Sequence, residues 1–281
     1  MTQQVGAPTS VGPRLDTTQR DYAGAADFYD DTRRASPSLV AAMLEQLGPP
    51  NGRTLLEVGC GTGNYAAAFA EAGFRVIALD PSREMLARAA AKLPGQVTRA
   101  VGESLPLPDR SIDCTVTVNV FHHLRDPRLL LGELARVTRD RTLHHLTEHG
   151  QFRAHWAMHY FPLLRHERPG EHPRLATLVR LLRRAGFVDI DPVRFDYRDT
   201  ADASLMPLRS ASPWRLRDGE YRMGISAFRR LTPAEDASGE AALAADLASG
   251  RFAEVRRGYD AAWSSVGDSL ILVAKPAPSL R

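Results

Sequence analysis

The stretch Leu55-Leu-Glu-Val-Gly-Cys-Gly-Thr-Gly-Asn-Tyr65 decides the fold of this chain. An apolar run leads into three alternating glycines, Gly59, Gly61 and Gly63, and a helical pattern follows them. Glycines let the backbone turn sharply and let a ligand approach without meeting a Cβ atom. A loop of this kind after a first strand is typical of nucleotide sites in doubly wound folds.

Strand-like and helix-like segments alternate outward from this loop. The expected strands are residues 53–58, 74–79, 97–101, 112–118, 142–147, 187–195 and 269–275, and the helices between them are 64–72, 82–93, 127–137 and 171–185. This spacing implies right-handed crossovers and a parallel sheet covered on both faces. We therefore predict an α/β, doubly wound, Rossmann-like fold around a seven-stranded sheet.

The rest of the chain is predicted to form a cover and a lid. Its expected parts are a disordered tail (1–15), an N-terminal helical cover (16–50), the core (51–197), a lid or acceptor-binding insertion (198–266), and the last core strand with a tail (267–281). A long insertion within a compact fold is usually a lid or binding element. Inside this one, Thr232-Pro-Ala-Glu235 has the pattern of a helix capping box.

Composition limits the partners of the protein. The net charge is +3, but the basic residues are scattered and are matched by 33 acidic ones, so no nucleic-acid partner is expected. No apolar run approaches the roughly 20 residues of a membrane helix, so no membrane partner is expected either. Two cysteines, Cys60 and Cys114, make no disulfide scaffold, which favours a cytoplasmic location.

The glycine loop fits one nucleotide pattern better than another. A dinucleotide fingerprint needs glycine or alanine at the sixth position from Gly59, where this chain has Asn64. The chain instead places Glu57 before the glycines, and Asp80 closes the next predicted strand. A carboxylate at that position offers two acceptors to a ribose diol.

These motifs resemble those of the class I S-adenosylmethionine-dependent methyltransferase family. The first family motif resembles residues 57–63, and its second acidic position resembles Asp80. A third motif is similar to residues 101–113 and a fourth to residues 118–124. The resemblance covers about residues 20–195 and the last strand, and it implies S-adenosyl-L-methionine as the cofactor and a methyltransferase as the activity.

The resemblance also implies which residues contact the cofactor. The glycines would approach its methionine part, and Asp80 would accept from the ribose hydroxyls. Asn119 and Val120 would face the methionine part and the methyl sulfonium. Family members often have an aspartate at the position before Gly102, where this chain has Val101. The adenine amino group would then bind the backbone of Gly102 or the side chain of Glu103. The full set is Tyr22, Glu57, Gly59, Cys60, Gly61, Gly63, Asp80, Pro81, Met85, Val101, Gly102, Glu103, Asn119 and Val120.

One segment departs from the family pattern. Small-molecule members usually have Pro-Gly-Gly before the fifth strand, whereas this chain has Thr138-Arg-Asp-Arg-Thr142. The start of that strand is therefore left open.

Seven of the nine histidines lie between His144 and His172, where such an enzyme builds its acceptor pocket. A general base helps when the acceptor is a hydroxyl or a carbon acid, and histidine is suited to this near neutral pH. His149 and His159 are the catalytic candidates. A helix over residues 150–168 would place His155 and His159 on one face. The candidate substrate-binding residues are His155, Trp156, Tyr160, Tyr197 and Trp214.

A metal site among these histidines is conceivable, but the H-E-x-x-H order and a cysteine partner are lacking, so no metal is predicted. The predicted activity is methyl transfer to oxygen or carbon of a hydrophobic small molecule in bacterial secondary metabolism. The alternatives are an enzyme that couples methylation to another step such as cyclisation, an RNA or protein methyltransferase, and a non-catalytic cofactor-binding protein. The resemblance also allows a homo-oligomer.

Overall fold

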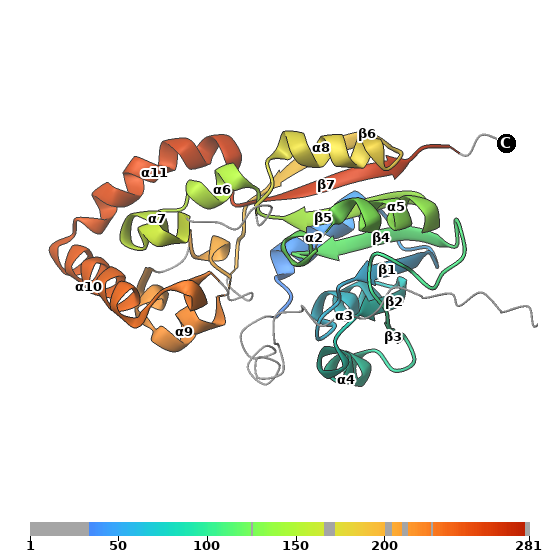
Figure 1. Cartoon of the computed structure of the whole chain (residues 1–281), viewed down its shortest axis with the longest axis horizontal. Helices are drawn as coiled ribbons and strands as arrows, with labels where there is room; N and C mark the ends of the chain where they lie inside the picture. Colours follow the sequence, from blue (N-terminus) through green and yellow to red (C-terminus); the bar gives the residue numbers. More distant parts are fainter. Residues whose placement is uncertain are drawn as a thin grey trace, which may run out of the picture.

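The computed structural model describes residues 34–124, 126–165, 172–199, 204–209, 213–225 and 227–278. A seven-stranded sheet with the order β3-β2-β1-β4-β5-β7-β6 forms its centre (Figure 1). The strands are β1 (Thr54–Val58), β2 (Arg75–Asp80), β3 (Val97–Arg99), β4 (Ile112–Val118), β5 (Thr138–Leu146), β6 (Phe187–Phe195) and β7 (Ser269–Pro276). The predicted doubly wound fold is confirmed. The sheet is mixed rather than wholly parallel, because β7 pairs antiparallel with both β5 and β6.

Helices cover both faces of the sheet. The helices α2 (Pro37–Leu47), α3 (Asn64–Glu71) and α4 (Arg83–Lys92) share a core with Leu55. The helices α5 (Pro127–Val137) and α8 (Leu175–Arg184) share another core with Leu56. Successive strand residues point to opposite faces, so these two leucines belong to different layers.

The fifth strand starts earlier than the sequence pattern suggested. Helix α5 ends at Val137 and β5 begins at Thr138, where residues 142–147 had been expected. The register against β4 shifts by one residue between Ile112 and Cys114, which oppose Thr138 and Arg141. The Thr138 side chain is buried and its hydroxyl bonds the hydroxyl of Thr115 at 3.0 Å, so the segment that replaces the family turn is a strand.

The helix expected over residues 150–168 is broken. It consists of α6 (His149–Arg153), α7 (Ala157–Tyr160) and a 3-10 turn, η2 (Pro162–Arg165). Between α6 and α7 the Nδ1 atom of His155 accepts the backbone N–H of Ala157 at 3.1 Å, which takes the place of a helical hydrogen bond. His155 is consequently buried while His159 is exposed, and the two do not share a helix face.

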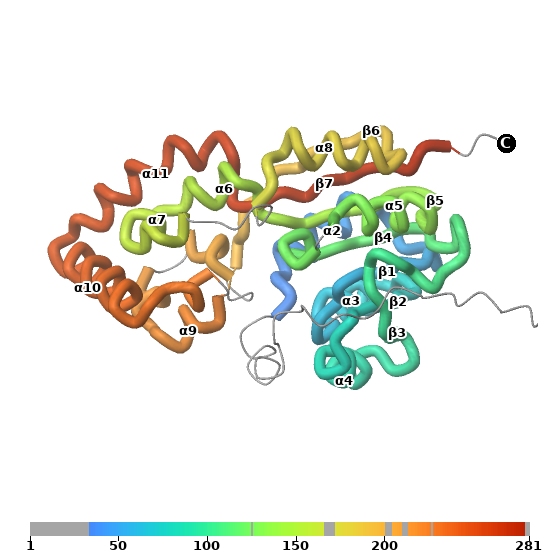
Figure 2. The backbone as a smooth tube through the Cα atoms, viewed as in Figure 1, coloured from blue at the N-terminus to red at the C-terminus, as the bar shows by residue number. Residues whose placement is uncertain are grey.

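A helical cap lies beyond one end of the sheet. It comprises residues 148–165 and the described residues of 204–266. The later stretch forms η3 (Met206–Arg209), η4 (Pro213–Arg217), α9 (Gly219–Gly224), η5 (Phe228–Arg230), α10 (Pro233–Ser249) and α11 (Phe252–Val266). Helix α6 contacts α11, and α7 contacts α10. The two stretches, which are distant in sequence, therefore lie side by side (Figure 2).

The start of α10 has the expected chemistry. The Thr232 hydroxyl accepts the backbone N–H of Glu235, and the Glu235 carboxylate accepts the backbone N–H of Thr232, so the capping box is confirmed. Within the described ranges, the structure contains no helix that is both long and apolar enough to cross a membrane.

Candidate cofactor site

The glycine loop turns at the carboxyl end of β1. Gly59, Gly61 and Gly63 have φ angles of 76°, 54° and 81°, in the left-handed region that favours glycine. The N–H groups of Gly59 and Cys60 both donate to the Leu79 carbonyl, at 2.8 and 2.9 Å. A Cβ atom on Gly59 would lie 2.6 Å from a methyl carbon of Val120, so this position excludes a side chain by conformation and by space.

Asp80 ends β2 and fixes the loop from the neighbouring strand. Its Oδ2 accepts the N–H of Gly61 at 2.9 Å, and its Oδ1 accepts the N–H of Ser82 at 2.8 Å. The side chain is largely buried, which raises the pKa of the carboxyl, while the two N–H donors oppose that shift. Each oxygen has a second lone pair, so the carboxylate can still accept from two ribose hydroxyls.

Two buried oxygen atoms at the loop lack a partner within the described part of the chain. They are Oε2 of Glu57 and Oγ1 of Thr62, each on a residue that is 1% exposed. Burial raises the pKa of Glu57 to about 8, and the nearby Asp80 charge adds to that increase. Buried polar atoms without a partner are uncommon and often mark functional sites. Together with the free acceptor positions of Asp80, they fit a polar nucleoside cofactor at this loop.

Other predicted cofactor residues gather at the same edge. A Cβ atom on Gly102 would lie 3.1 Å from Val58 at the end of β1, so the third-motif segment contacts the first. Asn119 has a φ of 56° and its N–H donates to the carbonyl of His145 at 3.0 Å, which ends β4 beside β5. Cys60, Met85 and Val120 are buried, whereas Pro81, Val101 and Glu103 are partly exposed. Tyr22 lies outside the described residues.

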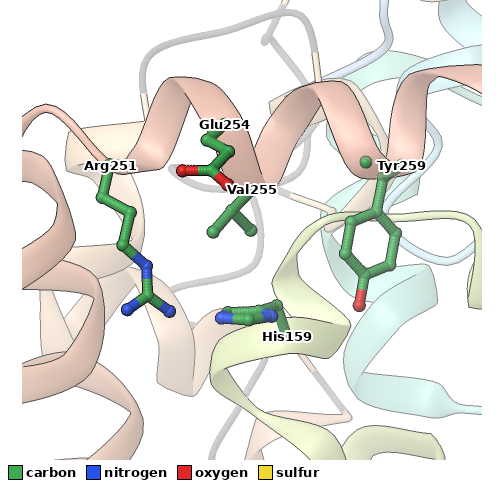
Figure 3. A pocket seen from close by; sticks show the side chains of 6 residues that line it. His159, Arg251, Glu254, Val255 and Tyr259 are labelled. Atoms are coloured by element: carbon green, nitrogen blue, oxygen red, sulfur yellow. The ribbon is translucent and has the colours of Figure 1, made fainter.

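The two catalytic candidates occupy different elements. His149 is the first residue of α6, three residues after β5 ends, so it stands near the carboxyl edge of the sheet. His159 belongs to α7 and is exposed. It lies in an open groove whose other wall is α11, with Arg251, Glu254 and Tyr259 around it (Figure 3).

Four of the five predicted substrate-binding residues are buried. His155 and Trp156 pack against each other, with ring centroids 5.0 Å apart. The Tyr160 hydroxyl donates to Asp246 at 3.0 Å, and the Tyr197 hydroxyl bonds Nε2 of His145 at 3.1 Å. Trp214 is the exposed member, at 55%. The structure thus places the first four in packed interior and does not gather all five into one cluster.

Sequence reasoning missed two long-range contacts, one at the glycine loop and one at the start of α2. The ammonium of Lys92 reaches the glycine loop from α4, and its helical position alone gave no signal for that contact. Asp199 accepts hydrogen bonds from the Ser36 hydroxyl at 2.9 Å and the Ser38 backbone N–H at 3.0 Å. The Ser36-Pro37 pair marks a helix start, but the distant aspartate cannot be paired with it from sequence.

A seven-stranded sheet in this order, with a glycine loop after β1 and an acidic residue closing β2, is a Rossmann-like α/β fold, and folds of this kind bind nucleotides at the carboxyl edge of the sheet. Residues 56–151 match a sequence model described as a methyltransferase domain. An uncharacterised methyltransferase of Mycobacterium sp. (strain JLS) is 44% identical over 124 residues, which are 42% of this chain and 48% of that protein. The chain thus matches its curated relatives over about half of their length.

Solved structures agree with this assignment. A candidate methyltransferase from an antibiotic biosynthesis pathway of Anabaena variabilis ATCC 29413 is 25% identical, with a TM-score of 0.71 over 86% of this chain and 98% of that one. Phosphoethanolamine N-methyltransferase 2 of Haemonchus contortus, solved with S-adenosylhomocysteine, shares the fold at 17% identity and a TM-score of 0.58, over 94% of this chain and 59% of that one. Residues 56–151 are thus similar to a methyltransferase domain, and the chain shares the fold of solved methyltransferases.

Proposed function

We propose that this protein uses S-adenosyl-L-methionine to methylate oxygen or carbon of a hydrophobic small molecule. The observation that carries the proposal is the contact between Asp80 and the loop after β1. The Asp80 carboxylate accepts the N–H of Gly61 and still has lone pairs that can accept from a ligand. This arrangement lies at the carboxyl edge of the sheet, where doubly wound folds bind their ligands.

The cofactor, when bound, supplies a methyl group already activated on a sulfonium. The tasks left to the protein are to orient the two reactants and to exclude water. Asp80 would hold the ribose, the glycines would leave room for the methionine part, and Val120 would lie beside the methyl donor. Glu57, beneath the loop, would support its conformation rather than contact the acceptor.

The acceptor class is inferred from the cap and from one relative. The cap contributes apolar and aromatic side chains to the core, among them Trp156, Phe161 and Phe228, and this apolar character supports a hydrophobic acceptor. The Anabaena protein, which matches over most of both chains, is assigned to an antibiotic biosynthesis pathway. This supports a role in secondary metabolism. His149 is the favoured base because it lies three residues after the end of β5, and His159 is the second candidate.

Calorimetric binding of S-adenosylhomocysteine tests the cofactor assignment, with NAD as the control ligand. We expect wild-type protein to bind the adenosyl ligand and not NAD. Asp80→Asn should weaken binding at least about tenfold, since one charged acceptor is lost. Asp189→Asn, on the exposed edge strand β6, is the matched control and should bind like wild type. Binding of NAD alone would overturn the proposal.

The methyl transfer itself is tested by mass spectrometry of candidate acceptors after incubation with S-adenosylmethionine. A gain of one methyl group on a phenolic or carbon-acid acceptor supports the proposal. Transfer confined to RNA or protein would instead favour the alternative substrate classes. His149→Gln should lower turnover without changing the affinity for S-adenosylhomocysteine, because the base acts on the acceptor.

A further inference from the structure

A single ammonium group joins α4 to the glycine loop. Lys92 is the last residue of α4, and its Nζ donates to the carbonyl of Thr62 at 3.0 Å and to Oδ1 of Asn64 at 2.6 Å. These two acceptors stand on either side of Gly63, the last glycine of the loop. Lys92 therefore binds the point at which the loop becomes helix α3.

The same helix approaches the loop closely at Gly63. A Cβ atom on Gly63 would lie 3.0 Å from Cβ and 3.2 Å from Cα of Ala89, one turn before Lys92. Backbone packing thus brings α4 against the loop, and the lysine bonds the two residues next to that contact. The loop is held on its other side by Asp80 through the N–H of Gly61.

We propose that Lys92 is a positioning residue of the cofactor site, which keeps the glycine loop in the conformation that binds S-adenosylmethionine. This inference rests on the proposed function. Lys92 acts through the loop and does not itself touch the cofactor. Without the ammonium, the second half of the loop would lose both of these hydrogen bonds, and part of the binding energy would be spent on ordering it.

Lysine suits this position better than arginine. Of the 36 basic residues in the chain, Lys92 and Lys275 are lysines, and the other 34 are arginines. An ammonium is compact and can direct separate N–H groups to two neighbouring oxygens, whereas a guanidinium is a wide planar fork. Lys275 lies on β7 and pairs with the exposed Asp189 at 3.5 Å, which makes it the matched control.

The test measures the affinity of variants for S-adenosylhomocysteine by calorimetry. We expect Lys92→Met to raise the Kd about tenfold and Lys92→Arg to bind more weakly than wild type. Lys275→Met should bind with the affinity of wild type. Lys92→Ala should regain affinity on addition of propylammonium, which a lost packing contact would not do. Equal affinity of wild type and Lys92→Met would overturn the inference and leave the proposed function intact. Failure of wild type to bind would overturn both.

A second measurement needs no variant. A lysine held by hydrogen bonds reacts slowly with an acylating reagent, so acetylation by an N-hydroxysuccinimide ester reports whether Lys92 is engaged. S-adenosylhomocysteine should slow acetylation of Lys92 severalfold, while Lys275 serves as an internal reference and keeps its rate. Mass spectrometry of peptides distinguishes the two sites. An unchanged ratio of the two rates in the presence of bound ligand would contradict the inference.

Discussion

A glycine can be needed for its backbone conformation or for lack of space, and Gly63 and Gly95 allow the two reasons to be compared. Both have left-handed backbones, with φ angles of 81° and 73°. A Cβ atom on Gly63 would press against the backbone of Ala89, whereas one on Gly95 would meet nothing within 4 Å. The cost of an alanine at Gly95 is therefore conformational alone, and at Gly63 it includes a steric clash between the loop and α4.

We predict that Gly95→Ala lowers the free energy of unfolding by about 1–2 kcal/mol, the cost of a left-handed residue with a side chain. Gly63→Ala should cost at least about 1 kcal/mol more, because the backbone of α4 has to move. Denaturant unfolding of the two variants measures the difference. Gly63→Ala should also weaken binding of S-adenosylhomocysteine, and equal stability losses in the two variants would contradict the clash.

Glu57 makes stability depend on pH. Burial raises the pKa of its carboxyl from 4.5 to about 8 in the folded protein. Between these values the folded protein retains a proton that the unfolded chain has released, so stability falls as pH rises and the loss is complete above about pH 8. The slope is at most about 1.4 kcal/mol per pH unit.

Glu57→Gln removes this titration. We expect the wild-type free energy of unfolding to fall relative to the variant between about pH 5 and pH 8, and the difference to stay constant above that range. Denaturant unfolding of both proteins at several pH values measures the two curves. Parallel curves across the whole range would mean that Glu57 titrates normally.

At the level of elements, the junction of α5 and β5 depends on a pair of buried hydroxyls. Thr115 on β4 and Thr138 on β5 are fully buried and bond each other at 3.0 Å. Thr115→Val or Thr138→Val alone would leave one hydroxyl without a partner and cost about 1–3 kcal/mol. The double variant should cost less than the sum of the two, as measured by denaturant unfolding. Additive costs would show that the hydroxyls do not depend on each other.

Several elements could be predicted from the sequence because periodicity and turn residues agree in them. The strands 112–118 and 187–195 were predicted with the bounds that the structure shows. The prediction failed where a side chain replaces a helical hydrogen bond, as His155 does, and where a strand follows a helix with no turn residue, as at Thr138. Neither arrangement leaves a periodic signal.

Some residues of the candidate site could likewise be predicted from the sequence, and others could not. Glycines 59, 61 and 63 and Asp80 could be predicted because their proposed roles depend on neighbouring sequence and on the order of strands. Lys92 and Asp199 were missed because each contacts residues 28 or more positions away, which only the folded chain brings together. The assignment of a base among the histidines stays a prediction.

At the scale of the whole molecule, the cap is fastened to the sheet where the chain passes between them. Asp268, just before β7, accepts from the Trp263 indole at 2.8 Å and from the Tyr197 backbone N–H at 3.0 Å. Gln151 of α6 donates to the Val266 carbonyl at 2.9 Å. These hydrogen bonds connect α11, α6 and the segment after β6 to one another. The cap and the sheet are therefore joined at several points along the chain.

Loss of the indole donor should loosen the cap. We predict that Trp263→Phe speeds amide hydrogen exchange in α6 and α11 while the central strands β1 and β4 keep their protection. The variant should also lose about 1–3 kcal/mol of stability, because a buried carboxylate loses a donor. Trp214→Phe is the control, since that tryptophan is 55% exposed. Uniform acceleration throughout the described residues would show global rather than local destabilisation.

The position of β7 has a consequence for how the protein is made. This strand comes from the last part of the chain, yet it lies between β5 and β6 in the sheet. While a ribosome is still producing the cap, β5 has an open edge and β6 has no partner, and unpaired strand edges invite association with other chains. The sheet closes only when residues 269–276 have emerged, so the exposed edges of β5 and β6 need shielding until that point of synthesis.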